Sequence, residues 1–102
     1  MARYVIERLY DTVVQEEIAK VGSRSKSVGL KHFPDITWEH SHVVSDDSSI
    51  KSFCVYEAPD PERLREHAER VGGHMITNLY EIAADVTPND FSRVSMAVPE
   101  LR

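Results

Sequence analysis

The side chains best suited to chemistry in this chain are its histidines, which are His32, His40, His42, His67 and His74. Two of them stand two positions apart in the run ITWEHSHVV, whose β-branched and aromatic residues predict a strand over residues 36–44. Because strand side chains alternate between faces, both imidazoles are expected on one face, together with Ile36, Trp38 and Val44. Glu39, which precedes the pair, is expected on the opposite face. Imidazole and carboxylate together suit nickel, zinc, copper or cobalt.

Two more histidines lie in and after a predicted helix. Asp60 followed by Pro61 predicts the start of this helix, and the glycine pair at 72–73 predicts its end. His67 falls beside the apolar stripe of the helix, and His74 follows the glycines, where the backbone is free to turn. Each histidine also fits an ordinary hydrogen-bonded structural role, so the spacing alone does not separate a metal site from structural imidazoles.

Glutamates occur inside predicted strands, where this residue type is depleted, and they are Glu7, Glu39, Glu57 and Glu81. Solvated strand edges and ion pairs with residues such as Arg8 explain this pattern, and a shared polar site on the sheet is the alternative. Cys54 lies in mid-strand and is expected to be an inert buried thiol, because no local motif activates it. The sequence contains no phosphate-binding glycine loop, Ser-His-Asp pattern or dinucleotide fingerprint.

The hydrophobic patterns complete an alternation of strands and helices. Strands are expected over residues 3–9, 36–44, 50–57 and 78–84. The first helix is expected to begin at Thr12, which forms a capping box with Gln15, and to end at Gly22. The polar run at 23–35 is expected to be mainly a connection, with room for one short helical piece around Val28.

This order, βαββαβ, predicts an α+β, ferredoxin-like fold. Its crossovers place both helices on one face of a four-stranded antiparallel sheet. The 102 residues suit a single domain over 1–102, with about 89–102 as a C-terminal extension. The strands carry apolar residues at both parities, so we expect a second subunit to cover the other face of the sheet in a homodimer.

Composition narrows the class of partners. The formal net charge of −5 argues against nucleic acid and anionic membranes, because phosphate groups bind basic surfaces. No apolar run approaches the roughly 20 residues of a membrane-spanning helix, and MARYVIERLY lacks the apolar stretch of a signal peptide. The single cysteine cannot form an internal disulfide. Together these features predict a cytoplasmic protein.

Four stretches of the sequence stand out, and they are YVIERLY at 4–10, ITWEHSHVV at 36–44, FCVYEAPDPERLREHAERVGG at 53–73 and NLYEIAADVTP at 78–88. They resemble the DUF4242 family, small bacterial proteins often described as nickel-binding protein-like. The resemblance covers most of the chain, and CVYEAP at 54–59 followed by REHA at 65–68 is its most specific part. It implies a ferredoxin-like, usually dimeric protein, with one branch that binds nickel through histidines and carboxylates.

By position, the resemblance implies metal-site roles for His40, Glu39, His67 and Glu81. Two positions depart from the family pattern. His42 stands where an aromatic residue is frequent, and His74 lies in a run where proline commonly follows the glycine that ends the helix.

The leading interpretation is that a cytoplasmic homodimer binds a divalent transition metal, nickel first. The candidate ligands are His40, His42, His67, His74, Glu39 and Glu81. The alternative is a small-molecule-binding protein or enzyme of the dimeric α+β barrel type, with its site between the sheet and a partner subunit. There His40, His67 and Glu81 would act as general acids or bases. An interaction module without a site is the third interpretation. A closed, partly apolar pocket with one histidine pointing into it would favour the second.

Overall fold

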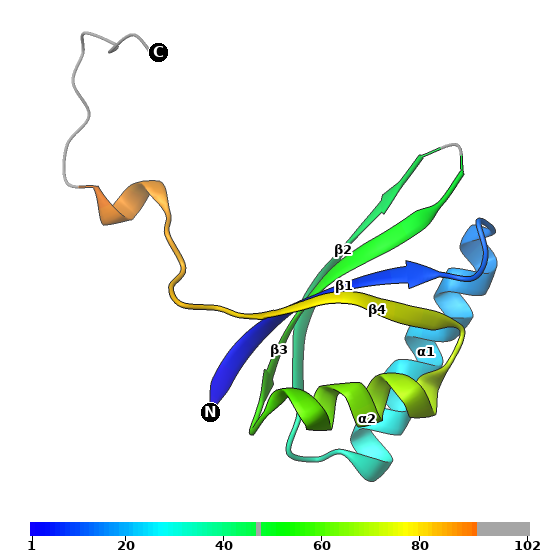
Figure 1. Cartoon of the computed structure of the whole chain (residues 1–102), viewed down its shortest axis with the longest axis horizontal. Coiled ribbons are helices and arrows are strands. Elements are labelled where there is room, and N and C mark those ends of the chain that lie inside the picture. Colours follow the sequence, from blue (N-terminus) through cyan, green and yellow to red (C-terminus); the bar gives the residue numbers. More distant parts are fainter. Residues whose placement is uncertain (47, 92–102) are drawn as a thin grey trace, which may run out of the picture.

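A computed structural model describes residues 1–46 and 48–91 (Figure 1). Its elements are β1 (Ala2–Tyr10), α1 (Gln15–His32), β2 (Thr37–Ser45), β3 (Ile50–Ala58), α2 (Pro61–Val71), β4 (His74–Glu81) and the short 3₁₀ turn η1 (Pro88–Asp90). The predicted C-terminal extension falls mostly on residues 92–102, which lie outside the described residues.

The four strands form one antiparallel sheet in the order β2-β3-β1-β4. Figure 1 shows both helices on the same side of this sheet, as the right-handed crossovers of a βαββαβ chain require. The predicted ferredoxin-like α+β fold is therefore confirmed. We call the side that carries α1 and α2 the helix face and the uncovered side the open face.

The hydrophobic core lies under the helices and is built from alternate residues of the two central strands. Tyr4 stands opposite Tyr56 and Ile6 opposite Cys54, and each of these side chains is buried. Leu64 of α2 closes the cluster from above and is fully buried. Complete burial of one leucine is worth about 1.5–3 kcal/mol, so α2 is tied to the sheet by its apolar stripe.

Helix α2 has the limits that its capping residues predict. The Asp60 side chain accepts a hydrogen bond from the Arg63 backbone N–H at 2.9 Å, and Pro61 is the first helical residue. Gly72 and Gly73 both have positive φ, which ends the helix and turns the chain at once into β4. For this reason β4 begins already at His74, and it ends at Glu81. The strand predicted over 78–84 therefore lies too far along the chain.

Helix α1 corrects the first helix prediction. It runs unbroken from Gln15 to His32, so Gly22 does not end it and the run at 23–35 is mostly helical. Val14 is the N-cap, and Thr12 instead accepts a hydrogen bond from the Val14 backbone N–H. The helix ends at Phe33 because Pro34 comes next, and a residue that precedes proline is disfavoured in helical conformation.

Candidate functional site

The two strand histidines lie side by side on the open face. The ring centroids of His40 and His42 are 5.3 Å apart with the planes nearly perpendicular, and both side chains are exposed. His40 stands opposite Val55 and His42 opposite Phe53, whose side chains point away from the helices. The expectation that these two imidazoles share a face is confirmed.

A β-bulge in β2 changes the rest of the predicted alternation. The register slips between Trp38 and His40, so Glu39 has no partner of its own on β3. Trp38 therefore lies on the helix face, where its ring stacks on Tyr56 at 6.2 Å, and its Nε1–H donates to Ser41 at 2.9 Å. The prediction that Trp38 shares a face with the histidines is wrong, because strict period two does not survive a bulge.

Glu39 is held by an arginine on the open face, so the expectation that it lies on the face opposite the two histidines is wrong. Its carboxylate accepts two hydrogen bonds from the Arg3 guanidinium, at 2.7 and 3.0 Å, and this pairing lowers the pKa of Glu39. Arg3 also pairs with Asp85. Glu39 lies next to His40 in sequence, but it would have to leave Arg3 to reach a metal ion.

His67 points into the interior of the helix face. Its side chain is 1% exposed and lies between the rings of Phe33 and Tyr56. Its Nε2–H donates to the Ser25 carbonyl oxygen at 3.1 Å, which leaves Nδ1 buried without a partner. Burial lowers the pKa of His67, so the imidazole is held neutral.

His74 lies on the helix face as well, next to Tyr10, with ring centroids 5.7 Å apart. Its Nδ1–H donates to the Gly72 carbonyl oxygen at 3.0 Å, and Nε2 is buried without a partner. Burial, assisted by the positive charge of Arg8, lowers the pKa of His74 to about 4.

Glu81 ends β4 on the edge of the sheet opposite β2 and pairs with Tyr4 on the helix face. The sheet therefore separates His67, His74 and Glu81 from the open-face histidines. Across residues 1–46 and 48–91, a single chain contains no group of three or more His, Cys, Asp or Glu side chains positioned to hold a metal ion. The six candidate ligands divide into an open-face set, His40, His42 and Glu39, and a helix-face set, His67, His74 and Glu81.

A cleft of about 660 Å³ opens between α1 and the edge strand β2. Its walls include the aromatic rings of Phe33, Trp38 and Tyr56, and His67 contributes to its lining. The cleft lies between the second half of α1 and the beginning of β2, because α1 packs chiefly against α2 rather than against this strand. Sequence reasoning missed it, because the bulge hid the direction of Trp38 and the second half of α1 was predicted as a connection.

Arg8 is the other residue that sequence reasoning missed. It is 2% exposed and lies on the helix face, with its guanidinium carbon 5.2 Å from the centre of the Tyr56 ring. The sequence carried a signal, since Arg8 has the same parity in its strand as Tyr4 and Ile6. Ion pairing of strand glutamates is confirmed for Glu7, which Lys51 binds, and for Glu39, which Arg3 binds, but Arg8 takes no part in it among residues 1–46 and 48–91.

Fold and site together define a small ferredoxin-like α+β protein with a histidine pair on its uncovered sheet face. A family model described as "Nickel responsive protein SCO4226-like" matches residues 4–82, and the chain belongs to this family. The nickel-related part of the sequence resemblance is thus supported at the level of the family.

Two solved structures support the fold. SCO4226 from Streptomyces coelicolor A3(2) has a TM-score of 0.61 at 15% identity, covering 81% of this chain and 99% of its own. The de novo designed protein Foldit4 has a TM-score of 0.55 at 10% identity, covering 83% of this chain and 100% of its own. No curated protein matches the chain.

Neither α1 nor α2 nor any other helix of the described part is long and apolar enough to cross a membrane.

Proposed function

We propose that this protein binds a divalent transition metal, nickel first, on the open face of its sheet through His40 and His42. The observation that carries the proposal is the adjacency of the two exposed rings, 5.3 Å apart on one edge strand. Within residues 1–46 and 48–91, neither imidazole makes a hydrogen bond to another side chain or to the backbone, so both have nitrogen lone pairs available to a metal. The family description, nickel responsive, supports nickel as the metal.

Two imidazoles supply only part of a coordination sphere, and a second copy of the chain can supply more. The open face carries exposed apolar side chains, among them Phe53, Tyr80, Met75 and Val44. An apolar sheet face of this kind favours burial against another surface. We propose a homodimer in which two open faces meet and bring histidine pairs of both chains to shared metal sites.

Nickel titration by calorimetry, combined with light scattering, tests both parts of this proposal. We expect heat of binding near neutral pH and a particle of twice the 11.6 kDa chain mass. His42→Ala should weaken nickel binding, whereas His32→Ala, at the exposed end of α1, is the matched control and should not. Absence of nickel binding, or equal loss in the two variants, would reject the metal site. A monomer that still binds nickel would reject only the dimer.

A reducing compartment fits this proposal. Cys54 is buried and unpaired, so the chain has no disulfide that would require oxidising conditions. We place the protein in the cytoplasm on this ground.

The cleft between α1 and β2 favours a second candidate function, the binding of a small molecule with a flat apolar part. Aromatic walls and one buried histidine are typical of such sites. His67 lines the cleft from the helix face, and His40 borders it at the β2 edge although its ring lies beside His42 on the open face. Glu81 lies at the far edge of the sheet, so a role for it in acid–base chemistry here is not supported. The site lies within one chain rather than between subunits.

Trp38 is the only tryptophan and lines the cleft, so its fluorescence reports occupancy. Titration with 1-anilinonaphthalene-8-sulfonate should quench Trp38 in a saturable way. Leu30→Glu places a negative charge at the cleft wall, which repels the negatively charged sulfonate of the probe, so this variant should weaken the quenching. Quenching that is linear and unaffected by Leu30→Glu would reject the cleft as a binding site.

A further inference from the structure

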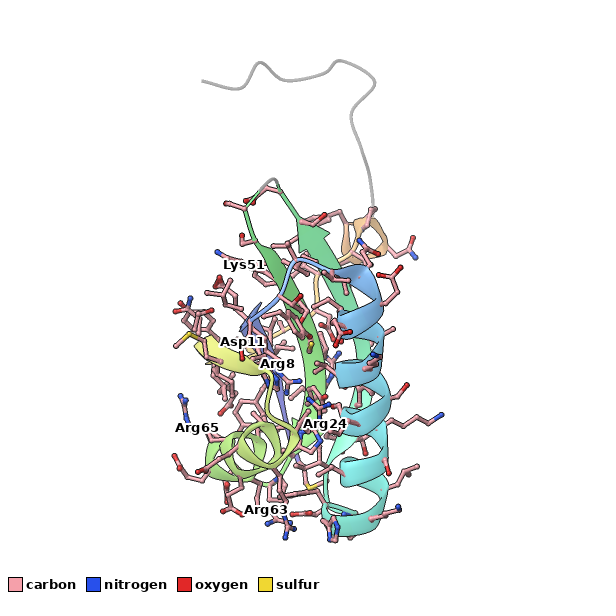
Figure 2. All side chains as sticks on the ribbon, turned by 90° about the vertical axis from the view of Figure 1, so that its right-hand side faces the viewer. Arg8, Asp11, Arg24, Lys51, Arg63 and Arg65 are labelled. Atoms are coloured by element: carbon pink, nitrogen blue, oxygen red, sulfur yellow. The ribbon has the colours of Figure 1, made fainter. Side chains whose placement is uncertain are left out.

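Arg8 is a buried cation without a counter-ion. Its side chain is 2% exposed, and its Nε and Nη2 atoms are buried without a hydrogen-bond partner. None of the ion pairs among residues 1–46 and 48–91 includes it. Figure 2 shows Arg8 on the side of the sheet that carries the helices, toward α1, while Arg65 points outward from α2.

The groups that face Arg8 form no ion pair with it. Asp11 is the one acid that acts on the same His74 as Arg8 does, and none of the ion pairs among the described residues joins the two. Its own strand contributes Tyr10, whose hydroxyl is hydrogen-bonded to Ser52 at 2.9 Å. Strand β3 contributes Cys54 beside Ser52 and the ring of Tyr56, α2 contributes His67, and β4 contributes His74. From α1 comes a second cation, Arg24, which donates to the carbonyl oxygens of Val71 and Gly72.

A buried charge without a partner is strongly unfavourable, because the interior does not replace the hydration that the ion has lost. The two unpaired donor nitrogens of Arg8, Nε and Nη2, add to this cost, since each has given up hydrogen bonding to water. A water molecule could accept a hydrogen bond there but would leave the charge uncompensated. An anion would accept the hydrogen bonds and also compensate the positive charge. A guanidinium is shaped to donate two parallel hydrogen bonds to an oxyanion.

We propose that Arg8 forms an internal binding site for a small oxyanion of the carboxylate or phosphate type, on the helix face between β1, β3 and α1. The Tyr10 and Ser52 hydroxyls lie on the neighbouring residues of the sheet and are the further donors available to it. The site is independent of the proposed metal site, because the sheet separates Arg8 from His40 and His42. A bound oxyanion would tie the helix layer to the sheet, because α1 by itself makes few contacts with the strands.

The test is thermal unfolding of the full chain in formate, in phosphate and in neither, with ionic strength held by a bulky sulfonate buffer. Saturating oxyanion should raise the wild-type midpoint by about 4 °C or more. Arg8→Met should lose this rise, and Arg65→Met, which removes an exposed charge from α2, should keep it. The stronger of the formate and phosphate responses identifies the kind of oxyanion that fits.

Without oxyanion, Arg8→Met should be at least as stable as the wild type, because it removes an uncompensated charge. With oxyanion the order should reverse. Arg8→Lys keeps the charge but loses the paired donors, so its response should be smaller than that of the wild type. The proposal is overturned if neither anion raises the wild-type midpoint, or if wild type and Arg8→Lys respond equally. If Arg8→Met does not fold, the comparison with Arg8→Lys decides.

Discussion

Histidine side chains have opposite environments on the two faces of the sheet. On the open face, His40 and His42 are exposed and lie next to each other. On the helix face, His67 and His74 each donate one ring N–H to a backbone carbonyl oxygen, and the second ring nitrogen of each is buried without a partner. The first pair is available to an external ligand, and the second is fixed as neutral structural imidazole.

The charged side chains of the two faces also differ in their burial and in their partners. The open-face ions Arg3, Glu39, Glu7 and Lys51 are paired with one another at the surface. On the helix face, Arg8 is buried and unpaired. The difference shows that residue type does not decide function in this fold, because burial and partners determine which histidine or arginine remains available to a ligand.

The largest expected effect is the loss of core packing on the helix face. Leu64→Ala removes a fully buried side chain and should cost about 2–5 kcal/mol in the free energy of unfolding. Phe53→Ala on the open face should cost less in dilute solution, since Phe53 is 37% exposed, but should weaken self-association. Urea unfolding and light scattering measure the two effects. Similar unfolding costs for both variants would remove the distinction between the faces.

An intermediate effect is expected on acidification. His74 has a pKa of about 4 in the folded protein against 6.5 as its ordinary value, so the unfolded chain binds the proton more tightly. Stability should therefore fall as the pH drops from about 6.5 towards about 4, and His67, whose pKa is also lowered, adds to the loss. His74→Gln should reduce this acid dependence in thermal unfolding. An unchanged dependence would mean that His74 is not held neutral.

The smallest effects concern two glycines. Gly22→Ala should stabilise the protein by about 0.5–1 kcal/mol, because Gly22 lies inside α1 with open space around a new Cβ atom. Gly73→Ala should destabilise it, because Gly73 has φ +76° and its Cβ would lie 3.2 Å from Val21. Chemical denaturation of the two variants checks the opposite signs. Destabilisation by Gly22→Ala would indicate that the helix is interrupted there.

Much of this fold could be predicted from the sequence, because strong local signals agree with the tertiary structure. Asp60 and Pro61 begin α2, and the glycine pair at 72–73 ends it, as expected. The first helix could not be delimited in the same way. Gly22 is tolerated in mid-helix, and the helix continues until Pro34 disfavours helical conformation at Phe33.

The site was less predictable, because its geometry depends on pairing between strands. The bulge at Glu39 is a property of the β2–β3 register and reverses the face of Trp38 while leaving the two histidines together. The isolation of Arg8 depends on the absence of an acid on β3, β4, α1 and α2 at the same place. No single segment of sequence contains that information.

Nickel titration of His40→Ala and His67→Gln tests the central claim, that the open face and not the helix face binds the metal. Loss of a coordinating imidazole should cost at least the roughly tenfold that loss of an outer-shell partner costs, so His40→Ala should weaken binding by about tenfold or more. His67→Gln should leave the nickel affinity unchanged, once circular dichroism shows that the variant is folded. Equal weakening by both substitutions, or unchanged affinity in His40→Ala, would contradict the account.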